Sequence, residues 1–130
     1  MPHVPTIADL EKLIDRYCAA WSERDAVRRA AMLVEVLSEG ATYTDPRARA
    51  TDVDALVAHI GRMQEARPGA RVLRISAVDI HHDLARFGWC VELADQTRLP
   101  EGVDFIEIGR DGRIARIVGF FGPLTAATKA

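Results

Sequence analysis

A carboxylate stands on an apolar strand face in residues 102–109. Alternate residues of a strand point to the same side, so Asp104 shares its face with Ile106 and Ile108. An ionised carboxylate among apolar groups is costly unless it is paired, hydrogen-bonded or protonated through a raised pKa. Asp104 is therefore a candidate for proton chemistry. A shifted strand phase, or a turn capped by Asp104, is the structural alternative.

A second carboxylate follows a tyrosine and precedes a proline, in Tyr43-Thr44-Asp45-Pro46. The short strand predicted over residues 41–46 places Tyr43 and Asp45 on one face. Asp45 either closes the strand through an Asx-type turn or presents a mobile carboxylate at the mouth of a pocket. The sequence leaves both interpretations open.

Tyr17 supplies a hydroxyl on a helical apolar stripe that also carries Trp21, one turn further on. It is either a packed helix residue with a satisfied hydroxyl or a donor to a bound molecule. We take Tyr17, Asp45 and Asp104 as the candidate catalytic residues.

The remaining histidines and cysteines do not suggest a metal site. His81 and His82 are adjacent, so their side chains leave a strand on opposite faces, and a surface turn is the simpler interpretation. His59 flanks the apolar side of a predicted helix beside Ile60, and is either a flank residue or part of the pocket lining. Cys18 and Cys90 are far apart and form no CxxC pair, which indicates reduced core thiols. We expect no metal and no organic cofactor, and no nucleotide-binding, GxSxG or HExxH motif is present.

Three helices are predicted in the first half of the chain, where apolar residues recur at helical spacing. Each has a polar cap and an end signal: Thr6 to beyond Trp21, Asp25 to Gly40, and Thr51 or Asp52 to the Arg67-Pro68-Gly69 break. The second half is predicted as an antiparallel meander, with turns at His82-Asp83 and Asp111-Gly112. Its strands fall at residues 71–82, 85–94, 102–109 and 113–122.

Helices followed by a meander predict an α+β fold, a curved antiparallel sheet packed on three N-terminal helices around one apolar pocket. We assign residues 1–130 to a single domain. The side chains expected to contact a small hydrophobic ligand are Trp21, Tyr43, Met63, Trp89 and Phe121.

The charge pattern argues against two classes of partner. The 17 basic and 19 acidic residues are interspersed and give a formal charge of −2, with no basic block that would follow a phosphate backbone. No apolar stretch approaches the length needed to span a bilayer, and residues 1–5 lack the features of a secretory signal. We expect a cytoplasmic protein that binds neither nucleic acid nor membrane.

The order of elements, together with three segments, resembles the nuclear-transport-factor-2-like superfamily, which includes SnoaL-like polyketide cyclases and ketosteroid isomerases. The segments are Arg16-Tyr17-Cys18-Ala19-Ala20-Trp21, Tyr43-Thr44-Asp45-Pro46, and Val103-Asp104 leading into Asp111-Gly112-Arg113-Ile114. The resemblance implies a cone of curved sheet closed by helices, also described as a cystatin-like α+β roll. It also implies a homodimer that pairs through the broad sheet face.

The likeness to ketosteroid isomerases implies a role for each candidate. Asp45 matches the Asp-Pro carboxylate that shuttles a proton in that family, while Tyr17 and a protonated Asp104 match the donors to a dienolate oxygen. The chain departs from these relatives in three ways. Thr44 replaces an acidic neighbour, Arg47 and Arg49 are expected near the pocket mouth, and Gly102 stands where limonene-epoxide-hydrolase-like members need an arginine.

Two functions follow as hypotheses. The first is an isomerase or lyase that transfers a proton next to a carbonyl of a small steroid-like or polyketide-like ligand. The alternative is a non-catalytic ligand-binding or dimeric scaffold domain. An enzyme requires Tyr17 and Asp104 to converge on one point, with Asp45 opposite.

Overall fold

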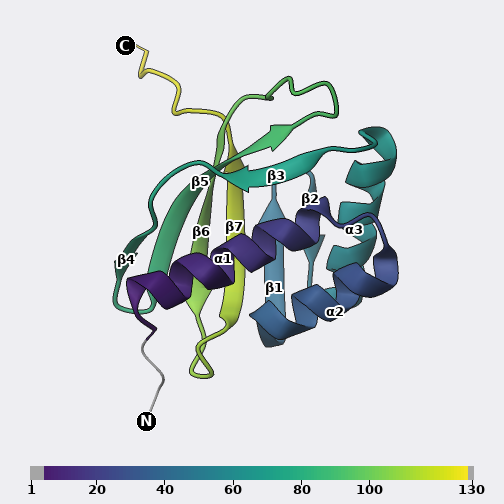
Figure 1. Cartoon of the computed structure of the whole chain (residues 1–130). Helices are drawn as coiled ribbons and strands as arrows, with labels where there is room; N and C mark the ends of the chain where they lie inside the picture. Colours follow the sequence, from purple (N-terminus) through teal and green to yellow (C-terminus); the bar gives the residue numbers. More distant parts are fainter. Residues whose placement is uncertain (1–4, 129–130) are drawn as a thin grey trace.

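The computed structural model describes residues 5–128, in which three helices cover one face of a curved seven-stranded sheet (Figure 1). The helices are α1 (Ile7–Ser22), α2 (Ala26–Val36) and α3 (Val53–Ala66). The predicted α+β class, with a curved sheet closed by helices, is confirmed. No helix among the described residues is long and apolar enough to cross a membrane.

The helix starts agree with the predicted caps. Thr6 and Asp9 form a capping box, in which the Thr6 hydroxyl accepts from the Asp9 backbone N–H at 3.0 Å. Asp25 accepts from the third residue after it, and so does Asp52, which is therefore the cap of α3 rather than Thr51.

The predicted end of the second helix is wrong. α2 ends at Val36, and β1 (Leu37–Asp45) begins at once, so Gly40 lies inside a strand. Its φ of 78° falls where the pairing of β1 shifts register between Leu37 and Thr42. A helix end and a β-bulge both use a glycine with positive φ, so the residue type alone does not separate them.

Seven strands form the sheet, in the order β2-β1-β7-β6-β5-β3, with β4 also paired to β5. Besides β1, they are β2 (Ala48–Ala50), β3 (Arg71–Arg74), β4 (Asp79–His81), β5 (Leu84–Glu92), β6 (Gly102–Ile108) and β7 (Ile114–Phe121). The predicted meander is confirmed for β5, β6 and β7, which pair antiparallel.

Two details of the predicted sheet are corrected. The sheet is mixed rather than wholly antiparallel, because β1 pairs with β7 in parallel after a long crossover through α3 and the meander. The predicted strand at 71–82 is divided into β3 and β4. Between them the Ser76 hydroxyl accepts the Gly88 N–H at 2.7 Å in place of a ladder carbonyl.

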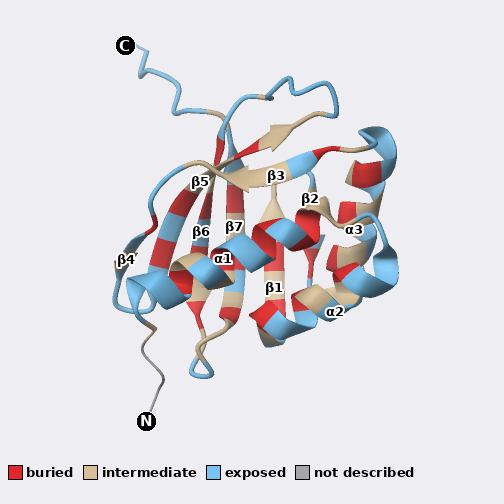
Figure 2. Ribbon diagram, in the orientation of Figure 1, coloured by how far each residue is buried: buried red, intermediate tan, exposed pale blue. Residues whose placement is uncertain are grey.

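The core lies between the helices and the concave face of the sheet. Buried residues alternate with more exposed ones along β5 and β6 (Figure 2). Members of the core from both layers include Leu10, Ile14, Leu33, Leu56, Ile60, Ile106, Ile114 and Ile117. Burial of this apolar surface is the main force that holds the helical layer on the sheet.

The buried side chain of Arg29 fixes α3 against the end of α1. Its guanidinium donates to the carbonyls of Glu23, Arg24 and Val57 at 2.9 to 3.1 Å. These carbonyls satisfy the charged donor, because a buried guanidinium without partners would be strongly destabilising. The contact with Val57 holds the helical turn that precedes His59.

Candidate functional site

A cavity of about 580 Å³ opens between the concave sheet and the helices α1 and α3. All eight residues singled out in the sequence line it: Tyr17, Asp45 and Asp104, with Trp21, Tyr43, Met63, Trp89 and Phe121. The volume lies in the range of small-molecule sites. The structure thus brings these residues together, and their roles stay predictions.

Asp104 lies on the concave face of β6, as its alternation with Ile106 and Ile108 predicts, and only 6% of it is exposed. Its Oδ1 accepts the Trp89 indole N–H at 2.8 Å, and no described residue donates to Oδ2. Burial raises the pKa of Asp104 to about 7, with the Trp89 bond opposing the rise and Asp45 adding to it. Near neutral pH the carboxyl is therefore partly protonated. Because Oδ1 already accepts a hydrogen bond, the proton belongs on Oδ2.

Two glycines create the space around this carboxyl group. A Cβ on Gly102 would lie 2.2 Å from the Trp89 ring, so only glycine lets the indole lie across β6 and reach Asp104. A Cβ on Gly119, the β7 residue paired with Asp104, would lie 2.8 Å from Oδ1. Glycines inside strands signal such close approaches.

Asp45 is held at the end of β1 by donors on both oxygens. Oδ1 accepts the backbone N–H groups of Arg47 and Ala48 at 2.7 and 2.9 Å, which is the Asx-type turn. Oδ2 accepts from the Tyr43 hydroxyl at 2.5 Å and faces His59 Nε2 at 3.3 Å. With its side chain 3% exposed, Asp45 is fixed, so the mobile carboxylate is not what the structure shows.

The two carboxyl groups have opposite proton affinities. Burial acts to raise the pKa of Asp45, but the hydrogen bonds from His59, Tyr43 and the Arg47 backbone outweigh it and leave the pKa below its ordinary value. Asp45 is therefore ionised at neutral pH. Gly119 lies between the two groups, with its Cβ position 3.5 Å from Asp45 Cβ. They thus lie on β1 and β6, with β7 between them, and both line the cavity.

His59, which the sequence favoured as a flank residue, lines the cavity. Its imidazole packs against the rings of Trp21 and Tyr43, with centroid distances of 5.7 and 5.8 Å, and its side chain is 15% exposed. The available signal was its position four residues before Met63, which puts both on one face of α3.

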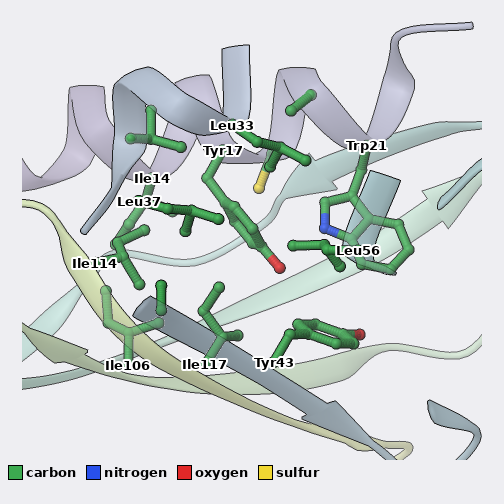
Figure 3. Close-up of a cluster of buried hydrophobic side chains, with 14 of the residues drawn as sticks. Ile14, Tyr17, Trp21, Leu33, Leu37, Tyr43, Leu56, Ile106, Ile114 and Ile117 are labelled. Carbon is green, nitrogen blue, oxygen red and sulfur yellow. The ribbon is translucent and has the colours of Figure 1, made fainter. Parts of the chain in front are cut away.

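Tyr17 projects from α1 toward the sheet, with its hydroxyl in the space between the two layers (Figure 3). The side chain is buried, and its hydroxyl has no hydrogen-bond partner among the described residues. Burial and the nearby Asp104 raise its pKa well above the ordinary value, although the Trp21 indole opposes this rise. The hydroxyl therefore stays protonated and has a hydrogen bond to give.

The cavity also has three arginines in its lining, Arg47, Arg62 and Arg67. Of the two arginines expected near the mouth, Arg47 is there and Arg49 is exposed outside the lining.

Within residues 5–128, no three His, Cys, Asp or Glu side chains are grouped to hold a metal ion.

These features were compared with known proteins. The sequence model of the SnoaL-like domain matches residues 14–117. The chain belongs to the SnoaL-like family. No curated protein matches it. A solved structure of a proposed SnoaL-like isomerase from Agrobacterium tumefaciens is 27% identical, with a TM-score of 0.81 over 87% of this chain and 97% of that one.

Two more distant structures show the same fold as this SnoaL-like chain. A proposed polyketide cyclase from Sinorhizobium meliloti is 21% identical, with a TM-score of 0.67 over 88% of this chain and 99% of that one. A protein with a ketosteroid isomerase-like fold from Catenulispora acidiphila, in complex with trimethylamine, is 13% identical, with a TM-score of 0.68 over 85% of both chains. The resemblance in the sequence is confirmed at the level of family and fold.

Burial of Asp104 makes the stability of the protein depend on pH. Because its folded-state pKa of about 7 exceeds the ordinary 3.8, the folded state binds the proton more tightly, and stability falls as pH rises through that window. At about pH 8 we expect Asp104→Asn to unfold at a higher urea concentration than wild type. The free energy of unfolding of the variant should be larger by on the order of 2 kcal/mol. The advantage should vanish toward about pH 4. A difference that stays constant with pH would contradict the assignment.

Proposed function

We propose that this SnoaL-like protein is an isomerase or cyclase that transfers a proton next to a carbonyl of a small hydrophobic molecule. The observation that carries the proposal is the unpartnered hydroxyl of buried Tyr17, in the same apolar cavity as the unbonded Oδ2 of Asp104. A buried donor without a partner is rare in folded proteins, and a ligand oxygen that accepts from Tyr17 would satisfy it.

The two donors suit an oxygen that becomes negative. When a proton leaves the carbon next to a carbonyl, the C–H electrons form a carbon–carbon double bond and the carbonyl oxygen takes up the charge. Tyr17 and the protonated form of Asp104 each donate a hydrogen bond to that enolate oxygen, and burial raises the pKa of both groups. The apolar lining strengthens these hydrogen bonds by excluding water.

Asp45 is the base in this proposal, because it is ionised and lines the same cavity. Its four donors occupy its acceptor sites, so a substrate proton must displace one of them. The contact with His59 is the longest, at 3.3 Å, and is the one expected to give way. His59 then acts as a positioning residue.

A second candidate function follows from the same hydrogen bonds. A carboxylate with all its acceptor sites filled and a lowered pKa is a weak base, and its contacts to Arg47 and Ala48 also close the turn between β1 and β2. On this interpretation the cavity holds a hydrophobic ligand without catalysis, and Asp45 is structural.

Substitution of Asp45 separates the two functions. We expect wild type to convert a β,γ-unsaturated ketone to its conjugated isomer, and Asp45→Asn to lose on the order of 10² to 10⁴ in rate. Tyr17→Phe should also slow turnover, since it removes a donor to the enolate oxygen. Turnover is measured by the absorbance of the conjugated product.

The control is the urea unfolding midpoint of each variant, because a structural role for Asp45 lowers stability together with rate. Retention of wild-type activity by Asp45→Asn would rule out Asp45 as the base. If a panel of steroid and smaller unsaturated ketones, with and without a carboxylate group, shows no turnover above buffer, the non-catalytic function is supported instead.

We further propose that the protein is a homodimer that pairs through the outer face of the sheet. Phe105 and Phe120 lie on this face, 42% and 56% exposed, in edge-to-face contact at 5.9 Å. Adjacent large apolar side chains in solvent mark a surface that a second molecule covers.

We expect light scattering at micromolar concentration to give the mass of two chains, and Phe105→Ser/Phe120→Ser to give the mass of one. Leu124→Ser is the matched control, since Leu124 is fully exposed but lies outside the strands. A monomer mass for the wild type would contradict the dimer.

A further inference from the structure

The arginines of the cavity lining, Arg47, Arg62 and Arg67, form no ion pair with any described residue. Arg47 lies in the turn between β1 and β2, Arg62 lies on α3, and Arg67 is the C-cap of that helix. We refer to these three residues as the arginine rim. Among residues 5–128, no lysine or glutamate contributes to the lining.

Arg47 is held in place at the cavity. Its backbone N–H donates to Asp45 Oδ1 at 2.7 Å, and its guanidinium carbon lies 5.8 Å from the centroid of the Phe121 ring. A guanidinium on an aromatic face is positioned without neutralisation of its charge. Its donors thus remain available to a ligand.

The carboxyl groups inside the cavity do not neutralise the rim. Asp45 is surrounded by donors from its own turn, from Tyr43 and from His59. Asp104 bonds to Trp89 and is buried on the sheet. Three cationic side chains that form no ion pair with a described residue, beside an apolar cavity, create a potential that attracts an anion.

We propose that the ligand of this cavity is amphipathic, with a compact hydrophobic body and a carboxylate bound by the arginine rim. The planar guanidinium matches a carboxylate with two parallel hydrogen bonds, while the apolar wall of Trp21, Met63 and Trp89 accepts the body. For the enzyme, the substrate class is then a cyclic or aromatic keto acid. The assignment of a keto acid substrate rests on the proposed function, whereas the binding of a carboxylate by the arginine rim does not.

The test compares two ligands that share one apolar cage and differ in charge, 1-adamantanecarboxylate and 1-adamantanecarboxamide, by titration calorimetry. We expect wild type at low salt to bind the carboxylate about tenfold more tightly than the amide. Added salt should reduce the ratio. The triple variant Arg47→Gln/Arg62→Gln/Arg67→Gln should bind both with nearly equal affinity. Arg49→Gln, an exposed arginine outside the lining, is the matched control and should keep the ratio.

Equal affinities in wild type, an unchanged ratio in the triple variant, or no carboxylate binding below about 1 mM would overturn the proposal. These outcomes are separate from those for catalysis. A charge preference in a protein without ketone turnover supports the arginine rim and removes the enzyme. Turnover without charge preference removes the rim and leaves the enzyme.

Discussion

The site depends on one carboxyl group held on the apolar face of a strand. Asp104 gains a single hydrogen bond, from Trp89, which is too little to offset the loss of hydration, so its proton affinity rises. Two glycines of the neighbouring backbone make room for this carboxyl group and its partner. Gly102 admits the indole that donates, and Gly119 leaves room for the carboxyl itself, so β6 and β7 each carry a glycine at the site.

The contrast between the two aspartates gives the cavity its chemical character. Asp45 on β1 is separated from Asp104 on β6 only by β7, yet it stays ionised, because it closes a turn and accepts from Tyr43 and His59. Two aspartates close to one another thus differ in protonation state near neutral pH, because Asp45 is ionised and Asp104 is partly protonated. The same Asx turn also holds the backbone of Arg47 in place. The Asp45 carboxylate therefore contacts both the cavity residues Tyr43 and His59 and one member of the arginine rim.

Local patterns in the sequence were enough for the class of fold and for much of the site. Alternation in residues 102–109 placed Asp104 correctly, and the helical stripe placed Tyr17, since both depend only on the period of the element. The parallel pairing of β1 with β7 was not predicted, because it joins residues far apart in the chain. Gly40 was misassigned because a bulge and a helix end need the same φ. His59 was favoured as a flank residue because its contact with Asp45 depends on how α3 packs over β1.

The most direct test of this account is the titration of Asp104 itself, followed by carbon-detected NMR of its side-chain carboxyl and assigned by the signal lost in Asp104→Asn. The account predicts a midpoint of about 7, while the Asp45 carboxyl in the same spectra titrates below its ordinary value. A midpoint for Asp104 near the ordinary 3.8 would contradict it, because an ionised Asp104 has no proton to donate to a ligand oxygen.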